Sequence, residues 1–503
     1  MSPGAAERPL ALALDVGSSS VRALLYDRRG RPLTGLSSRV PYEMTTSPAG
    51  GVQVALGELL GHVETALDGL AARAGRRLGD VGTAGGCTFS HSLVALDPDG
   101  EPCTGVLSWA DTTSAAAAQE LKRQLDGPSL WQRTGAPLHA SYWPARLVHL
   151  RRLHPGVAHW AGFGDLLGEW LTGRRAASIS SASATGLLER RHDRWDGQLL
   201  EQLRVDPETL PVLTPDDEPL GPLRPELARR WPALAGVPWY PVWSDAACGN
   251  VGLGCHGPER AALMIGTSSA LRVLLDRREV DVPLGLFCFR LGESGSLLGG
   301  QLSEGGGSVA WLAELLRHRL EWLERAAAGV PPDGHGLTML PYLSGERGPG
   351  YHDHARAVFS GLSLSTGPGQ LFRALLEAVA LRLAALDDRL SAALDRPPLV
   401  VAAGGAVAAS GIWPQILADA LGRDIMLPRG AAQPSGRGAA LLALAYSGTS
   451  PLAAGEPVRG RFVAADAARH DVYRAALRRQ QDLYELLSPA WRSANGTQRG
   501  RSR

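Results

Sequence analysis

Two short segments rich in glycine and hydroxyl residues stand about half a chain apart, at residues 17–20 (Gly-Ser-Ser-Ser) and 266–269 (Gly-Thr-Ser-Ser). Each follows an apolar run and precedes an arginine and a pair of leucines. Turns of this kind between strands present backbone N–H groups and small hydroxyls to phosphate oxygens. Two such turns facing each other would hold both ends of a nucleotide's triphosphate, so the sequence predicts a duplicated, phosphate-binding unit.

Either segment alone could be an ordinary hairpin with serines at turn positions. The recurrence favours phosphate binding, because a plain hairpin has no reason to repeat the same small hydroxyl residues. The copies differ where Asp15 of the first is replaced by Met264 of the second. Only the first turn therefore offers a carboxylate to a metal ion.

A second carboxylate, Asp245, closes the apolar run 237–243 and precedes a stretch of small residues. There it could point into a cleft and accept the proton of a hydroxyl during phosphoryl transfer, a reaction that needs little covalent help from protein. The alternative is a helix N-cap, a common role for aspartate. Both interpretations stay open, and Asp245 is the candidate general base.

Three further motifs have competing explanations. Gly404 and Gly405, in a strand-turn-helix pattern over 402–420, could let the backbone approach a flat ligand or could serve tight packing. Residues 252–257 fit G-x-G-x-x-G, but no strand precedes them directly, so we interpret them as a false match to a dinucleotide motif. Residues 352–354 (His-Asp-His) lack further ligands at the usual spacing, and no metal is expected there.

The bulk composition indicates a multi-domain α/β protein. Its 503 residues exceed one ordinary core, and we expect an N-terminal domain over about 1–255, a C-terminal domain over about 256–450, and a helix with a disordered basic tail over about 451–503.

A formal net charge of +1 gives no field that would attract nucleic acid or an anionic membrane. The five cysteines form no C-x-x-C pair and no signal peptide is evident, so we expect a cytoplasmic protein with free thiols. A homodimer is compatible with the sequence.

Periodicity and turn residues predict the elements that position these motifs. Strands are expected over 10–16, 21–26, 81–87, 237–243 and 261–265, and helices over 56–72, 144–153 and 370–390. The chain is expected to open as a β-meander and to continue with mixed strands and helices. From Ser493 onward the polar, arginine-rich tail is expected to be disordered.

Taken together, these segments resemble the FGGY family of carbohydrate kinases, from about residue 12 to residue 447. Residues 340–364 resemble the family's Gly-Glu-Arg, Ala-Arg and Phe-x-Gly-Leu signature, and residues 405–422 resemble its adenine-side segment. The resemblance implies two actin-like (ribonuclease-H-like) domains around a central cleft. It also implies that ATP binds mainly to the second domain and the sugar mainly to the first.

The resemblance also assigns roles to individual residues. Asp245 would be the general base, and Asp15 would help to place Mg²⁺. The residues expected at the ATP phosphates and the adenosine are Gly17, Ser18, Ser19, Arg22, Gly266, Thr267, Gly306, Gly307, Gly405 and Ser410.

Residues 90–97, 108–111 and 133–139 look most like the gluconokinase branch of the family. The implied reaction is transfer of the γ-phosphate of ATP to the terminal hydroxyl of D-gluconate. His91, Trp109 and Asp111 are expected to contact this sugar. Four positions depart from the usual family pattern, namely Thr113, Arg146, His149 and Ala246. The loss of an arginine at 113 weakens the case for a carboxylate-bearing sugar, since paired guanidinium contacts hold a carboxylate well.

Two alternatives stay open. The nearer one is the same chemistry on xylulose or on another pentulose or polyol. The other is an actin-like ATP-binding sensor without catalysis, which would need neither an aligned base nor both phosphate turns.

Overall fold

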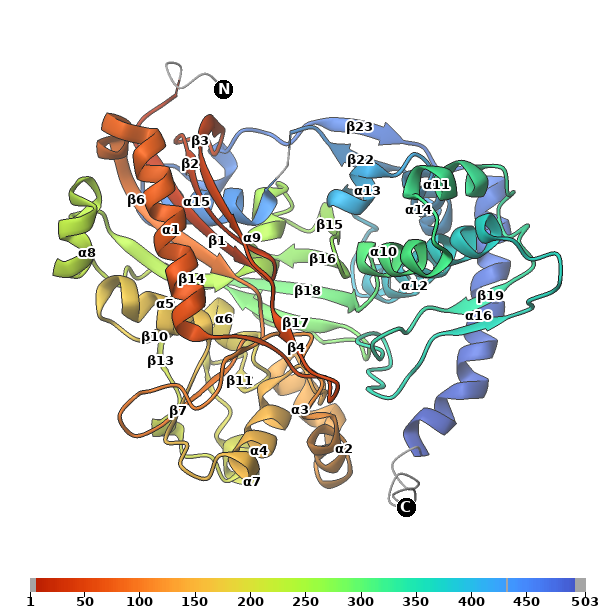
Figure 1. Cartoon of the computed structure of the whole chain (residues 1–503), viewed down its shortest axis with the longest axis horizontal. Helices are drawn as coiled ribbons and strands as arrows, with labels where there is room; N and C mark the ends of the chain where they lie inside the picture. Colours follow the sequence, from red (N-terminus) through yellow and green to blue (C-terminus); the bar gives the residue numbers. More distant parts are fainter. Residues whose placement is uncertain (1–5, 431–432, 494–503) are drawn as a thin grey trace.

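The computed structural model describes residues 6–430 and 433–493 (Figure 1). The tail for which disorder was expected lies outside these residues, apart from Ser493 at the end of the last helix. Two bodies, each built around its own sheet, lie side by side in Figure 1, and the last helix runs along the second one.

The first sheet has five strands in the order β14-β6-β1-β2-β3. Strand β1 (Leu10–Gly17) pairs antiparallel with β2 (Ser20–Tyr26) and parallel with β6 (Val81–Thr88). Strand β3 (Pro32–Pro41) extends the meander, and β14 (Trp239–Ser244) pairs parallel with β6. Central strand β1 is buried on both faces, as its near-continuous apolar run requires.

The second sheet repeats this arrangement and adds a strand at each edge, in the order β17-β18-β16-β15-β21-β22-β23. Strand β15 (Arg260–Ile265) is antiparallel to β16 (Ser269–Leu275) and parallel to β21 (Leu399–Ala403). The remaining strands are β17 (Phe287–Leu291), β18 (Gly295–Leu302), β22 (Ile425–Pro428) and β23 (Gly460–Val463). The order β18-β16-β15-β21-β22 matches β3-β2-β1-β6-β14 in both neighbours and directions, so the two sheets are copies of one unit.

Helices cover both sheets and join them. Helix α1 (Leu56–Ala74) packs on β2 and β3, and α12 (Pro368–Ala392) is the long buried helix of the second body. Between the bodies, α9 (Asp245–Gly252) crosses α15 (Pro434–Tyr446). This crossing is close because glycines face it, and a Cβ at Gly438 would collide with the carbonyl of Cys248. Gly252 meets Pro434 in the same way, so this glycine of the G-x-G-x-x-G match serves packing.

The other elements are shorter or peripheral. The remaining helices are α2 (Ala115–Gln124), α3 (Gly127–Thr134), α4 (Trp143–Leu153), α5 (Phe163–Thr172), α6 (Ile179–Ser183), α7 (Gly197–Leu203), α8 (Pro225–Arg230), α10 (Gly306–Leu316), α11 (Leu320–Ala328), α13 (Gly405–Ala409), α14 (Trp413–Leu421) and α16 (Ala467–Ser493). The remaining strands are β4 (Thr45–Thr46), β5 (Val52–Val54), β7 (Val94–Leu96), β8 (Val106–Leu107), β9 (His159–Ala161), β10 (Ala176–Ser178), β11 (Leu188–Glu189), β12 (Arg194–Trp195), β13 (Val212–Thr214), β19 (Thr338–Leu340) and β20 (Val358–Ser360).

The predicted α/β class with a duplicated unit is confirmed. The expected strands and helices are present with ends shifted by at most two residues, as for the helix expected over 56–72 that extends to Ala74. Four cysteines are buried and none forms a disulfide. Across the described residues, no helix combines the length and the apolar character needed to cross a membrane.

Candidate active site

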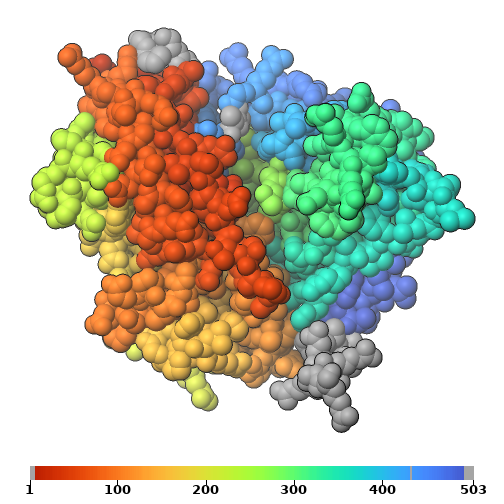
Figure 2. Space-filling model, in the orientation of Figure 1, coloured from red at the N-terminus to blue at the C-terminus, as the bar shows by residue number. Residues whose placement is uncertain are grey.

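The two phosphate-type turns face a hollow between the bodies, which Figure 2 shows between the red-orange and the green-cyan surfaces. A cavity of about 220 Å³ lies there. Its lining comes from both bodies and includes Ser18 of the first turn, Gly266 and Thr267 of the second, and Asp245. The fold therefore brings together residues from the two halves of the chain that the sequence singled out separately.

Asp245 stands where β14 ends and α9 begins, at the carboxyl edge of the first sheet. Its carboxylate accepts two hydrogen bonds at Oδ1, from Ser90 N at 3.3 Å and from Ser90 Oγ at 2.8 Å. The Ser90 hydroxyl also lies 2.9 Å from Ser244 Oγ, so Ser244 can donate to it while it donates to Asp245. Asp245 lines the cavity, and among the described residues no side chain donates to its Oδ2.

The surroundings of Asp245 favour a basic carboxylate. The residue is partly exposed to the cavity and enclosed by protein elsewhere, and this burial raises its pKa, while hydrogen bonds from Ser90 and the charge of Arg272 act in the opposite direction. A raised pKa strengthens the carboxylate as a proton acceptor. The alternative role as N-cap gains no support, since Ser244 is the residue at the N-cap position and its side chain makes no capping bond.

Asp15 is a second buried carboxylate near this base. It lies opposite Arg22 on neighbouring strands, and Arg22 Nη1 donates to its Oδ2 at 2.9 Å. Burial raises the pKa of Asp15, and the negative charge of Asp245 raises it further, against the attraction of Arg22. Two buried carboxylates that disfavour each other's charge are stabilised by a cation between them.

Six of the ten predicted nucleotide residues line a second, larger cavity of about 620 Å³, which shares Gly266 and Thr267 with the first. The other four are Gly17, Ser18, Ser19 and Arg22, of which only Ser18 lines the first cavity. The predicted residues that line only this larger cavity are Gly306, Gly307, Gly405 and Ser410. The packing explanation holds for Gly404, whereas the approach of a ligand to the backbone stays a prediction for Gly405. Gly404 has φ +124° and packs against the backbone of Ile265, whereas Gly405 has open space in front of it.

The start of α10 is joined directly to the second turn. Gly306 N donates to the Gly266 carbonyl at 2.7 Å, and Gly307 N donates to the Thr267 carbonyl at 3.0 Å. A Cβ at Gly306 would approach Ala406 Cβ and the Gly266 carbonyl oxygen to 2.9 Å. Glycine is required at 306 because the Gly266 backbone and the Ala406 side chain both come close to this position.

Two of the three residues expected at the sugar line the smaller cavity, namely His91 and Trp109. His91 Nδ1 lies 2.5 Å from the Ala184 carbonyl, so Nδ1 carries the proton and Nε2 is an acceptor. Burial holds the pKa of His91 well below its usual range and keeps the ring neutral. A neutral imidazole with an acceptor nitrogen is suited to a sugar hydroxyl.

Asp111 has other partners. One oxygen accepts from Thr113 N at 3.1 Å and from Thr113 Oγ1 at 2.6 Å, and the other accepts from Val52 N at 2.9 Å. The residue is buried and does not line the cavity. Arg146, one of the unusual positions, donates to the carbonyls of His91 and Ser108 and thereby fixes the loops that carry His91 and Trp109. The contact of Asp111 with the sugar stays a prediction, and the geometry gives Asp111 a supporting role in the loop.

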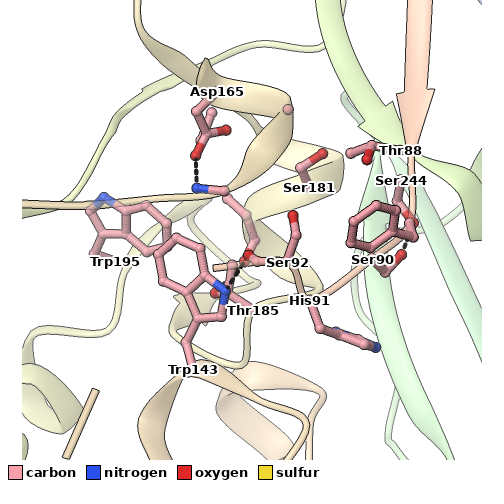
Figure 3. A pocket seen from close by; sticks show the side chains of 15 residues that line it. Thr88, Ser90, His91, Ser92, Trp143, Asp165, Ser181, Thr185, Trp195 and Ser244 are labelled. Atoms are coloured by element: carbon pink, nitrogen blue, oxygen red, sulfur yellow. Dashed lines mark hydrogen bonds between the residues drawn. The ribbon is translucent and has the colours of Figure 1, made fainter. Parts of the chain in front are cut away.

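A small cavity lies behind Ser90 and His91, lined by Trp143, Asp165 and Trp195 (Figure 3). In Figure 3 the His91 ring points away from the two tryptophans. The volume of about 20 Å³ is room for about one water molecule and not for a sugar. The cavity on the Asp245 side, at about 220 Å³, is the larger of the two cavities next to Ser90 and His91.

Four polar residues that line the Asp245 cavity were given no role by sequence reasoning, namely Ser90, Arg272, Gln301 and Arg347. Of these, Arg272 had been noted only as the arginine that follows the second turn. Ser90 and Arg347 stood inside segments that carried the family resemblance, so their segments were identified without their roles. Gln301 and Arg272 lie on β18 and β16, where only the sheet pairing shows that they face the cavity.

Comparison with known proteins gives the class that this fold and site define. The N-terminal and C-terminal domain models of the FGGY family of carbohydrate kinases match residues 10–252 and 261–446. The chain therefore belongs to the FGGY family of carbohydrate kinases, as the sequence predicted.

The individual relatives are named for different sugar substrates. The chain is 28% identical over 374 residues to the gluconokinase of Bacillus licheniformis, covering 71% of this chain and 73% of that protein. It is 29% identical over 469 residues to the xylulose kinase of Streptomyces rubiginosus, covering 89% and 90%. The crystal structure of gluconate kinase from Lactobacillus acidophilus has the same fold, with a TM-score of 0.87 at 22% identity over 96% of this chain and 99% of that one. Membership of this family implies an ATP-dependent sugar kinase. The names of these relatives are compatible with more than one sugar substrate.

Proposed function

We propose that this kinase transfers the γ-phosphate of ATP to the terminal hydroxyl of D-gluconate and releases 6-phosphogluconate. The observation that carries the proposal is the Asp245 carboxylate, which lines a cavity that also contains residues of both phosphate-type turns. The relatives named gluconokinase support the choice of a sugar acid.

In the proposed reaction Asp245 accepts the proton of the terminal hydroxyl through Oδ2, while Ser90 holds Oδ1. The hydroxyl oxygen forms a bond to the γ-phosphorus, the bond to the β–γ bridging oxygen breaks, and ADP leaves. The backbone N–H groups and hydroxyls of the turns at 17–20 and 266–269 bind the phosphate oxygens and stabilise their charge. Closure of the two bodies would keep water from intercepting the phosphoryl group.

The site suits a magnesium ion. Asp15 would supply an oxygen ligand beside the first turn, and the negative charge of Asp245, which raises the pKa of Asp15, favours a cation near them. When bound, Mg²⁺ would neutralise phosphate charge. Arg22, which contacts Asp15, fixes the orientation of this carboxylate.

Initial rates of ADP release across a panel of sugars test the proposal. We expect D-gluconate to have the highest kcat/KM, and mass spectrometry to detect a monophosphorylated sugar acid. Turnover of D-xylulose with none of D-gluconate would replace the proposal by its nearest alternative, a pentulose kinase, which relatives named xylulose kinase support. ATP binding without turnover of any sugar would indicate the non-catalytic sensor.

A further inference from the structure

A carboxylate without a partner lines the larger cavity, where the adenosine is expected. It belongs to Glu324 of α11, which lies one helical turn after Leu320, another residue of the lining. Within residues 6–430 and 433–493, Glu324 is the one charged residue of this lining, and its carboxylate forms no hydrogen bond and no ion pair. The residue is half-buried. Its two oxygens are therefore available to a ligand that fills the cavity.

The rest of the wall offers few side-chain groups that could recognise the edge of a base. Val309, Leu376 and Trp413 are buried, and Trp413 Nε1 already donates to the Leu376 carbonyl. Ser410 Oγ accepts from the backbone N–H groups of Ile412 and Trp413, which leaves its O–H as a donor. A donor to N7, an acceptor that adenine and guanine share, would not distinguish the two purines. The wall suits the flat, apolar faces of a purine.

The chemistry of a carboxylate selects the part of the nucleotide that it can bind. A carboxylate accepts hydrogen bonds and donates none, and it repels phosphates, so its partner must be a neutral donor. A nucleotide has such donors at the 2′- and 3′-hydroxyls of the ribose and at the amino group of the base. The base is expected at the buried apolar wall around Leu376 and Trp413, whereas Glu324 is half-buried. Two hydroxyls on adjacent carbons also match the two oxygens of one carboxylate.

We infer that Glu324 binds the 2′- and 3′-hydroxyls of the ribose, so that the kinase selects ribonucleoside triphosphates as its phosphoryl donors. The inference rests on the proposed function in one respect, the placement of the nucleotide in the larger cavity. Glu324 lies outside the segments 340–364 and 405–422 that carry the family resemblance, so the resemblance gave it no role. The inference adds a specificity-determining residue for the phosphoryl donor.

The test is calorimetric titration of the full chain, with Mg²⁺ and without sugar, using ATP and 2′,3′-dideoxy-ATP, which lacks only the two ribose hydroxyls. We expect the wild type to bind ATP about tenfold more tightly than the analogue, since hydrogen bonds to a charged group are strong but solvent weakens them at a half-buried site. Glu324→Ala should weaken ATP binding about tenfold and change the affinity for the analogue less than about twofold. Alanine favours helices, so α11 should stay folded. Glu321→Ala is the matched control, because it removes a carboxylate of the same helix that does not line the cavity, and both affinities should stay as in the wild type.

Titration with ITP, in which a carbonyl oxygen replaces the amino group of adenine, separates the ribose from the base. In Glu324→Ala the affinity for ITP should fall by the same factor as the affinity for ATP. Equal changes for ATP and dideoxy-ATP would overturn the inference, and so would a loss for ATP with ITP unchanged, which would mean that Glu324 binds the amino group. A wild type that binds ATP and dideoxy-ATP equally would also overturn it, whatever sugar is phosphorylated. A preference for ATP that depends on Glu324, combined with no turnover of D-gluconate, would support the ribose contact and refute the proposed reaction.

Discussion

Replacement of Asp245 by asparagine removes the proposed base with little change of shape. An asparagine can keep Oδ1 toward Ser90, whose N and Oγ donate to that oxygen at 3.3 and 2.8 Å, and place its amide where Oδ2 stood. The amide cannot accept the proton of the hydroxyl. General-base catalysis contributes about 10²- to 10⁴-fold, so kcat should fall by that factor, which corresponds to about 3–5 kcal/mol of transition-state stabilisation.

The same structure predicts what Asp245→Asn leaves unchanged. Asp245 does not line the larger cavity where the adenosine is expected, so ATP affinity measured by fluorescence titration should change less than about twofold. Burial raises the pKa of Asp245, so a neutral side chain suits the site and the melting temperature should not fall. Both quantities are measured on the purified full-length chain.

Asp165→Asn is the matched control for loss of a buried carboxylate in the same body. Burial raises the pKa of Asp165 to about 7, and the residue lines the small rear cavity of Figure 3. Its kcat should remain within about threefold of the wild type, since it removes no base from the sugar site. If Asp245→Asn retained more than about a tenth of the wild-type kcat, the reasoning that gives Asp245 the proton would be refuted.

The remaining predictions concern alignment, pH and packing. Ser90→Ala should lower kcat about tenfold without changing ATP affinity, because one charge-assisted hydrogen bond to Asp245 is lost; an unchanged kcat would show that Ser90 does not align the base. In the wild type, kcat/KM should rise with pH through the raised pKa of Asp245, because only its ionised form accepts a proton; an acid limb centred at the ordinary value of 3.8 would contradict the burial argument. Glu304 ionises at about 8 in the folded state against 4.5 in its ordinary state, so it lowers stability as pH rises between these values. Urea unfolding of Glu304→Gln should therefore show a gain over the wild type that is larger at pH 8.5 than at pH 5 by on the order of 3 kcal/mol, and an equal gain at both pH values would exclude that ionisation. Gly438→Ala should cost about 1–3 kcal/mol or more at the α9–α15 crossing, whereas Gly61→Ala in α1, with open space around it, should be neutral or stabilising; similar changes in both would refute the close crossing.

Local patterns were sufficient to predict the duplicated architecture. Each hairpin contains its own turn residues and apolar alternation, so the strands around residues 17–20 and 266–269 could be identified from nearby sequence. The position of Asp245 directly after a strand could also be predicted from local order, since β14 ends at Ser244 on the carboxyl edge of its parallel pair with β6. Comparison of the two halves supplied the expectation that the turns face each other.

The partners of the site residues could not be predicted in the same way. Ser90 and Asp245 are 155 positions apart and meet only because β6 and β14 are neighbours in the sheet. Trp109 and Arg347 come from different bodies, so no pattern within either segment indicates their stacking. Asp111 was expected at the sugar, but its oxygens are occupied by the adjacent Thr113 and by Val52, a contact that only the folded loop shows.

Asp353 illustrates the same limit of local reasoning. In the sequence it belongs to a short polar loop segment between two histidines. In the structure it is buried and joins the bodies, with Lys122 Nζ at 3.2 Å and His139 Nε2 at 3.0 Å from its oxygens. Asp353 contacts Lys122 and His139 only because the loop of the second body packs onto the first body.

The most direct test of the central claim is a crystal structure of Asp245→Asn with D-gluconate and a non-hydrolysable ATP analogue. We predict that the terminal hydroxyl oxygen lies within about 3.2 Å of the residue 245 side chain and points toward the γ-phosphate between the two turns. A sugar bound with another hydroxyl at residue 245, or bound outside the cavity between the bodies, would contradict the account.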